Sequence, residues 1–553
     1  MIDSQTGRSA PLARPSEQSH LDGSTRKTGR LLGRVISGSL SEGLEARLDL
    51  GASVEEMAVG RYVVVQGERR RFFGMVTDVR LEVNNPQVAG APPVTDGFVA
   101  EVIAGTTTYG VVEVQPMLTV EGDPPVPMPV KTVPTHFSAV REATDKDVEV
   151  VFGAEDETHF YIGQPIDMET RVCLDLKRLV ERSSGVFGKS GTGKTFITRL
   201  LLAGIVRNRA AVNLVFDMHN EYGWKGTSEG SHEVKGLKQL YGDRVRIFTL
   251  DPASTRRRGA TADFTVEIGY DQIEPDDIAM LREALGLSEA AIESLSRISR
   301  KLPGRDWFGT FVHMEPPDID EFAQREGLNA TTLNVLHRKL AERIARLPFI
   351  KEHVPDDSVK RILQTLVAGN SVVLEFGGQS ALDAYILVAN ILTRRIHERY
   401  VEAMERSMAD DSPKPLPLVI TIEEAHKFLS PEVADLTIFG TIAREMRKYN
   451  VTLLVVDQRP SEIDEEVMSQ IGTRITCLLD NDRDTAAVLG GIPGSSGLRS
   501  VLARLETKQQ AIILGHAVPM PVAIRTRDYG TPQSYDELRA KELLGGSLKD
   551  YFS

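Results

Sequence analysis

Cysteine is scarce in this 553-residue chain, which has only Cys173 and Cys477, far apart and each beside apolar residues. We expect both thiols to be buried and free, which argues against a disulfide framework and fits a reducing cytoplasm. Long apolar runs are lacking too, because none approaches the roughly 18 residues that a membrane-spanning helix needs. The polar N-terminus has no signal-peptide core. The sequence therefore predicts a cytoplasmic protein without a membrane anchor.

Positive charge is also in deficit. There are 65 Lys and Arg residues against 78 Asp and Glu, which gives a formal net charge of -13. A generally basic surface is excluded, so a nucleic acid would have to be held in a local patch or an internal channel. Because 41% of the residues are hydrophobic and 26% charged, the composition is that of a globular chain, long enough for about two to four domains.

The most specific motif lies at residues 184 to 205, SGVFGKSGTGKTFITRLLLAGI. An apolar strand end, a match to G-x-x-x-x-G-K-[ST] and an amphipathic helix follow one another, an order that is typical of a phosphate loop and disfavours an ordinary glycine turn. Lys194 is expected to reach the β- and γ-phosphates of ATP, and Thr195 to bind Mg²⁺ through its hydroxyl. The predicted nucleotide-binding residues here are Gly188, Ser190, Gly191, Thr192, Gly193, Lys194 and Thr195.

An acidic residue ends the next apolar run, in NLVFDMHNEYGW at 213 to 224. Ligands of parallel α/β sheets gather at the carboxyl ends of strands, so we expect Asp217 and Glu221 to lie near the nucleotide. The alternative is that Asp217 only caps the following turn. His219 is interpreted as a structural or polar-network residue, because no partner at metal-ligand spacing accompanies it.

Two adjacent carboxylates end a second apolar strand, in LPLVITIEEAHKFL at 416 to 429. This pattern is typical of a Walker B segment, although an acid-rich helix start would look similar. Glu423 is predicted to hold the Mg²⁺ shell, and Glu424 to act as the general base that polarises the attacking water. His426 is expected to support these acids rather than to bind the metal.

The segment FGTIAREMRKYNVTLLVVDQRPSEI, at 439 to 463, reads as a helix and then a strand. Gln458, just after the strand, is predicted to sense the γ-phosphate or the attacking water. Arg444 and Arg447 are three residues apart and so share a helix face. That face could present a guanidinium to the γ-phosphate of a neighbouring subunit, or it could be a solvated basic face.

The domain organisation follows from changes in pattern along the chain. Alternating short runs such as GLEARLDL, RYVVVQG, FFGMVTDVRLEV, GFVAEVIAG and YGVVEVQPMLTV predict a small antiparallel barrel or sandwich, in which Phe72, Phe73 and Tyr109 could be core or could stack on bases. The prediction is a disordered tail at 1–27, a barrel at 28–135, an α/β core at 136–267 and 359–528 that is interrupted by a helical insertion at 268–358, and a C-terminal tail at 529–553.

Taken together, the motifs carry a resemblance to a known family. GKSGTGKT, FDMHNEYG, VITIEEAH, IAREMRKYNVTLLVVDQRPSEID and PMPVAIRTRDY resemble, in that order and with similar spacing, the HerA family of hexameric DNA-translocating ATPases, and the N-terminal barrel resembles that family's HAS barrel. The resemblance implies a RecA-like ATPase core and a homo-hexameric ring around double-stranded DNA, with a NurA-type nuclease partner in many members. It also implies that Asp217 supports the site, that Arg444 or Arg447 acts across the subunit boundary, and that the closing strand braces a neighbour. The segment ERSSGVFG departs from the family pattern and leaves Arg182 without a role.

The sequence thus predicts an ATP-driven, ring-shaped DNA translocase or helicase that works with a nuclease on DNA ends. Three alternatives stay open. One is a HerA-like ATPase of an antiphage defence complex with another effector enzyme. The second is a conjugation-type DNA pump, which the lack of a membrane segment disfavours. The third is a nucleotide-binding scaffold without activity, which Glu424 disfavours.

Overall fold

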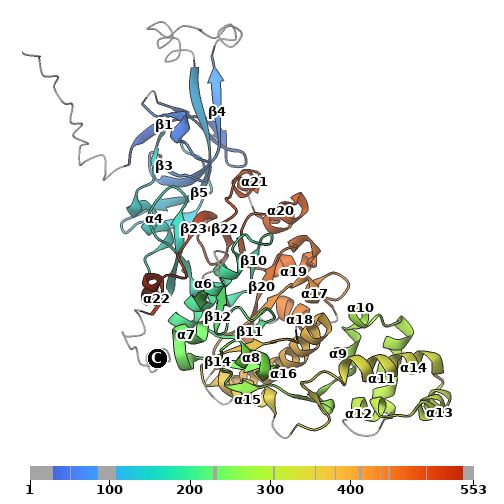
Figure 1. Ribbon diagram of the computed structural model, residues 1–553. Helices are drawn as coiled ribbons and strands as arrows, with labels where there is room; N and C mark the ends of the chain where they lie inside the picture. The colour runs from blue at the N-terminus through green and yellow to red at the C-terminus, as the bar shows by residue number, and fades with distance from the viewer. Residues whose placement is uncertain are drawn as a thin grey trace, which may run out of the picture.

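The computed structural model describes residues 29–49, 51–84, 108–227, 233–302, 306–354, 357–379, 381–409, 414–435, 437–445, 449–492 and 495–539. The predicted tail at 1–27, the run GFVAEVIAG and Arg447 lie outside these residues. A barrel stands at one end of the molecule, an α/β core fills the middle and a group of helices lies at the other end (Figure 1). Over the described ranges, no helix combines the length and the apolarity needed to cross a membrane.

The N-terminal sheet closes into an antiparallel barrel. Its strands follow one another in the order β2-β1-β7-β3-β4-β5, and an additional pairing of β2 with β5 closes the ring, while β6 extends β5 outside it. The strands are β1 (Leu31–Ser39), β2 (Gly43–Leu48), β3 (Tyr62–Gln66), β4 (Arg71–Val83), β5 (Thr108–Glu121), β6 (Val126–Pro129) and β7 (Ala139–Glu142). Because β7 fills the gap between β1 and β3, the barrel runs to Glu142, and the predicted limit at 135 is one strand too early.

Strand β3 connects the barrel to the α/β core, because its side chains belong to two different apolar clusters. Val63 and Val65 point into the barrel and join its own apolar cluster, whereas Tyr62 and Val64 join the cluster of the α/β core. The continuous apolar run YVVV, in place of an alternating pattern, matches a strand that is buried on both of its faces. Phe72 and Phe73 divide in the same way and are 3% and 1% exposed, so their rings are core and cannot stack on bases.

The central sheet has the order β15-β14-β18-β11-β19-β20-β10-β21-β22-β23-β8-β9. It is parallel from β15 to β21 and antiparallel from there to β9. The strands are β8 (His159–Pro165), β9 (Val172–Asp175), β10 (Ser184–Phe187), β11 (Val212–Asp217), β14 (Val245–Thr249), β15 (Phe264–Thr265), β18 (Ser371–Glu375), β19 (Leu418–Glu423), β20 (Val451–Asp457), β21 (Thr473–Thr476), β22 (Gln510–Gly515) and β23 (Val522–Thr526). Strand β20 lies between β10 and β19, which brings the ends of these three strands together.

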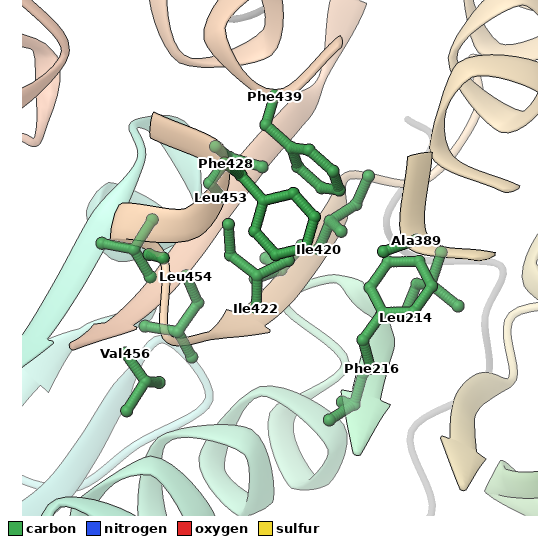
Figure 2. Packing of buried hydrophobic residues seen from close by; sticks show 14 of the residues in the cluster. Leu214, Phe216, Ala389, Ile420, Ile422, Phe428, Phe439, Leu453, Leu454 and Val456 are labelled. Carbon is green, nitrogen blue, oxygen red and sulfur yellow. The ribbon is translucent and has the colours of Figure 1, made fainter. Parts of the chain in front are cut away.

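Helices cover both faces of this sheet. Apolar side chains of β11, β19 and β20 pack under Ala389 of α16, Phe428 of α17 and Phe439 of α18 (Figure 2). The helix α6 packs against β10 and β11. The helices of the core are α4 (Asp145–Phe152), α5 (Leu176–Glu181), α6 (Lys194–Asn208), α7 (Leu237–Tyr241), α8 (Pro252–Arg257), α15 (Ser358–Val367), α16 (Leu382–Ala409), α17 (His426–Leu429), α18 (Ile438–Glu445), α19 (Glu465–Gln470), α20 (Asp482–Leu489), α21 (Ser495–Ala503) and α22 (Pro532–Arg539), and a short hairpin joins β12 (Lys225–Thr227) to β13 (Glu233–Lys235).

The helical group farthest from the barrel lies within the predicted insertion (Figure 1). Its helices are α9 (Pro275–Ala279), α10 (Arg282–Leu285), α11 (Glu289–Lys301), α12 (Trp307–Val312), α13 (Pro316–Glu326) and α14 (Ala330–Lys339). The short parallel pair β16 (Ile268–Gly269) and β17 (Ile350–Lys351) joins its two ends at the base. The periodic run from 274 to 302 is broken into three helices, and Gly286 ends α10 in the left-handed conformation with φ of 59°.

The C-terminal region differs from the sequence expectation, because the predicted tail contains the helix α22. Its Leu538 is fully buried, and its Tyr535 ring meets Tyr529 edge to face. Strand β23 pairs with β22 and β8 of the same chain, and its role as a brace for a neighbouring subunit stays a prediction.

Candidate active site

The phosphate loop joins β10 to α6 and forms one wall of a cavity of about 380 Å³. Gly193, the residue before α6, has a φ of 94° and no side chain that could cap the helix, so the first N–H groups of α6 are free to meet an anion. Gly188 is needed for another reason, because a Cβ there would lie 2.8 Å from the Cβ of Cys477. As predicted, Cys477 is buried and free, and so is Cys173.

Polar groups of the phosphate loop form hydrogen bonds with one another in this structure. The Lys194 Nζ donates to the Lys189 carbonyl at 3.0 Å, and the Thr192 hydroxyl donates to the same oxygen at 2.8 Å. Burial lowers the pKa of Lys194, because its ammonium lies in a largely desolvated position. A bound triphosphate would offer this ammonium a stronger, charged acceptor than the carbonyl.

Of the predicted phosphate-loop residues, Ser190, Gly191, Gly193, Lys194 and Thr195 line the cavity, and two do not. Thr192 is 1% exposed, with its hydroxyl turned inward to Lys189. The Gly188 N–H donates to the Asp457 carbonyl at 3.3 Å. These two residues therefore shape the loop from behind.

The loop after β11 is closed by Asp217, which is fully buried. Its carboxylate accepts the N–H groups of Glu221, Tyr222 and Gly223 at 2.7, 2.8 and 3.2 Å. This is the turn-capping alternative, and Asp217 is not among the residues that line the cavity. Burial, together with the nearby charge of Glu375, raises the pKa of Asp217.

Two residues of this capped turn, His219 and Glu221, line the cavity. His219 thus lines the cavity, and its interpretation as a structural or polar-network residue rather than a metal ligand stays a prediction. Arg199 of α6 is 1% exposed and donates to the Glu221 carbonyl through Nε at 3.0 Å and Nη2 at 2.6 Å. Arg199 carries no signal in the sequence, because an arginine inside an amphipathic helix is usually a solvated residue.

Glu423, at the end of β19, lies on the β11 side of the cavity. Its Oε1 accepts a hydrogen bond from the Tyr222 hydroxyl at 2.8 Å, and its Oε2 is buried with no hydrogen-bond partner among the residues that the structure describes. Burial, with the negative charge of Asp217 as a second cause, raises the pKa of Glu423 to about 8. A buried carboxylate with one oxygen committed and one open is suited to a cation.

Glu424 points to the opposite side. Its φ of 49° is unusual for a residue other than glycine, and the turn that it makes separates its side chain from that of Glu423. The Gln458 Nε2 donates to the Glu424 Oε1 at 2.9 Å, and both residues line the cavity. Gln458 reaches this position because β20, which ends just before it, lies between β10 and β19.

Arg444, one of the two predicted finger residues, does not line the cavity. Arg444 forms ion pairs with Asp435, Asp464 and Glu466 of its own chain, at 3.4 Å for the last two. Arg447 lies outside the described residues. Arg444 is thus engaged within the chain, and its action across a boundary stays a prediction.

Mg²⁺ fits the residues at the Glu423 end. Glu423 Oε2 would supply one carboxylate oxygen, and Thr195 lies on the wall of the same cavity. Within the described ranges, no group of three or more His, Cys, Asp or Glu residues could hold a metal by itself. That suits Mg²⁺, which keeps several waters and commonly binds through one or two protein groups together with substrate phosphates.

Comparison with known proteins gives two family matches. The family described as Helicase HerA, central domain, matches residues 160–396, and the HAS barrel domain family matches residues 32–123. The DNA double-strand break repair helicase HerA of Pyrococcus furiosus is 25% identical over 432 residues, which cover 73% of this chain and 74% of that protein. The protein of the same name from Sulfolobus acidocaldarius is 25% identical and is covered to 80%.

This chain is HerA-like. The resemblance predicted from the motifs is confirmed, together with the fold class of an α/β P-loop ATPase core behind an antiparallel barrel. It is also an ATP-hydrolysing enzyme of the helicase class. Among solved structures, the bacterial conjugative coupling protein TrwB aligns with 71% of this HerA-like chain and with 95% of its own chain, at 11% identity and a TM-score of 0.45.

Proposed function

We propose that this HerA-like enzyme is an ATP-driven translocase or helicase that acts on double-stranded DNA in the processing of DNA ends. One observation carries the proposal: the phosphate loop, the divergent acids Glu423 and Glu424, and Gln458 surround a single cavity. Hydrolysis needs a phosphate cradle, a metal ligand, a general base and a group near the γ-phosphate, and the cavity brings candidates for all four together. The names of the HerA relatives support DNA as the substrate.

In this proposal, ATP binds with its phosphates along the N–H groups of Gly191, Gly193 and Lys194. Thr195 and Glu423 would hold Mg²⁺, which neutralises charge on the phosphates when bound. Glu424 accepts a proton from the attacking water. Gln458 donates a hydrogen bond to the Glu424 carboxylate in this structure, and in this proposal its side chain would also contact the γ-phosphate.

We further propose a homo-hexameric ring that works in the cytoplasm, with DNA inside. The net charge of -13 supports an internal channel rather than an outer surface as the DNA-binding region. An arginine from a neighbour would complete each site, and Arg447 is the better candidate because Arg444 is already paired with three acids. The domain division in this proposal is a barrel to Glu142, a two-part ATPase core and an insertion near 268–358.

The partner in this proposal is a NurA-type nuclease. The alternatives are a HerA-like ATPase in an antiphage defence complex with another effector enzyme, and a conjugation-type DNA pump. Co-purification from the native host would distinguish them, because a nuclease, a different effector enzyme and a membrane complex have different compositions.

The test measures ATP turnover with and without duplex DNA, over a series of protein and salt concentrations, with Lys194→Ala as the background. We expect DNA to stimulate turnover several-fold. The duplex affinity should fall by about 10³-fold or more between 50 and 200 mM salt if about six phosphates are contacted. In a ring the specific activity should rise with protein concentration. Turnover that ignores every DNA form would contradict the translocase proposal.

A further inference from the structure

Asp457, the last residue of β20, contacts three of the segments that form the cavity. The residue is 1% exposed. The Oδ2 accepts the His426 N–H at 2.7 Å from the turn after β19, and the Oδ1 accepts the Arg459 N–H at 2.7 Å from the loop after β20. Its backbone carbonyl accepts the Gly188 N–H of the phosphate loop at 3.3 Å.

Glu424 and Gln458, the two proposed catalytic groups, lie within two residues of the positions that Asp457 holds. Glu424 is two residues before His426, and Gln458 stands between Asp457 and Arg459. The Glu424 carboxylate and the Gln458 amide then meet at 2.9 Å. Short backbone segments join Glu424 and Gln458 to the N–H groups that Asp457 binds. The position of the Asp457 carboxylate therefore sets the direction in which each side chain points.

The carboxylate is specifically suited to this role. Both oxygens are acceptors, and the His426 Nδ1 lies 2.9 Å from Oδ2 as a third donor. This hydrogen bond raises the pKa of His426, so the imidazole carries a proton to donate more readily. An asparagine has a similar shape but only one acceptor oxygen, so its NH₂ group would face an N–H group that needs an acceptor.

We propose that Asp457 is the positioning residue of the hydrolysis step, which holds the turn after β19 to the loop after β20 and so keeps Glu424 and Gln458 around the attacking water. Asp457 lines the cavity together with Glu424 and Gln458. Its own oxygens already accept hydrogen bonds from His426 and Arg459, however, so Asp457 acts through the two proposed catalytic groups. The inference rests on the roles proposed above for Glu424 and Gln458. It predicts an effect on the chemical step and little effect on nucleotide binding.

The first test is Asp457→Asn in the full-length protein, with kcat measured for ATP hydrolysis and the dissociation constant measured with a fluorescent ATP analogue. We expect kcat to fall about 10- to 100-fold, as is typical when an outer-shell carboxylate is replaced. The dissociation constant should stay within about threefold, because the substitution leaves the carbonyl that binds Gly188 in place. The matched control is Asp263→Asn, since Asp263 also accepts a backbone N–H, that of Ile247 at 2.7 Å, but lies beside β14 at the far edge of the sheet.

A second test separates positioning from a general loss of stability. If Asp457 acts through Glu424, the double variant Asp457→Asn, Glu424→Gln should be no slower than Glu424→Gln alone. His426→Ala removes only the imidazole and keeps the N–H, so it should lower kcat by less than Asp457→Asn. This variant decides the matter if Asp457→Asn does not fold.

Several results would overturn the inference. One is a folded Asp457→Asn variant with wild-type kcat, or one that loses only nucleotide affinity. Another is a double variant whose kcat is lower than that of Glu424→Gln alone. Where Asp457→Asn does not fold, a His426→Ala variant with full activity would also overturn it. Near-normal turnover in Glu424→Gln is a different outcome, because it would remove the proposed general base itself. The two failures are thus distinguishable.

Discussion

The two sides of the cavity hold adjacent carboxylates in opposite environments. On the β11 side, Glu423 is buried, bound to the Tyr222 hydroxyl and shifted to a pKa of about 8. On the β20 side, Glu424 has a side chain that is 31% exposed and is bound to the Gln458 amide. The strand β19 passes between β11 and β20, so two consecutive residues can face two different neighbours.

The difference shows how one strand end can supply two chemical roles. A metal ligand benefits from a dry site that holds one oxygen fixed and leaves the other open. A general base needs access to water, which the partial exposure of Glu424 supports. The left-handed backbone at Glu424 separates the two side chains, at a cost of about 1–2 kcal/mol for a residue other than glycine.

The largest expected effect is on the β20 side. Glu424→Gln keeps the shape and the hydrogen bond to Gln458 but cannot accept a proton, so kcat for ATP should fall at least about 100-fold. ATP affinity should stay within about threefold, because the phosphate loop is unchanged. The control is Glu432→Gln, a nearby acid outside the cavity wall. Turnover within a few-fold of wild type would contradict the difference in role between Glu423 and Glu424.

A smaller effect is expected on the β11 side. Tyr222→Phe removes the hydroxyl that fixes Glu423 Oε1, so the Mg²⁺ concentration for half-maximal turnover should rise about tenfold. The maximal rate at saturating Mg²⁺ should be nearly unchanged, since Glu424 and Gln458 are not touched. Tyr400→Phe is the matched control, because Tyr400 is buried on α16 and does not line the cavity. If instead the maximal rate fell with no change in the Mg²⁺ requirement, the two sides would not be separable.

The same comparison shows what a sequence can predict. The motifs located Lys194, Thr195, Glu423, Glu424 and Gln458, because each follows a strand whose apolar pattern is strong. They could not show Asp457, which looks like any acid at a strand end. Its contacts with His426 and Gly188 exist because β20 inserts between β10 and β19, an order that the sequence does not carry.

The barrel gives a second instance. Strand β7, at 139–142, is too short to have a pattern of its own, and only closure between β1 and β3 defines it. Strand β1 has glycines where its neighbours approach, and a Cβ on Gly33 would lie 2.0 Å from the Arg47 carbonyl oxygen. Those glycines interrupt the alternation that predicted the other strands.

The smallest expected effect is on stability. Glu423 has a folded-state pKa of about 8 and an unfolded value near 4.5, so between these values the folded state binds more protons than the unfolded state. The contribution of neutral Glu423 to the free energy of unfolding is therefore fully present below about pH 4.5, and it is lost as the pH rises toward 8. Glu423→Gln cannot ionise, so this part of the pH dependence should disappear.

The measurement is thermal unfolding with EDTA at pH 5.5 and pH 8. We expect the midpoint of Glu423→Gln to lie close to wild type at pH 5.5 and at least about 2 °C above it at pH 8, since about 1 kcal/mol corresponds to 2–4 °C in a domain of 150–250 residues. Some slope should persist, because burial also raises the pKa of Asp217. Glu432→Gln should follow wild type at both values. A Glu423→Gln midpoint that shifts equally at both pH values would mean that Glu423 is already ionised in the folded protein, and the contrast between the two carboxylates would then rest on their hydrogen bonds alone.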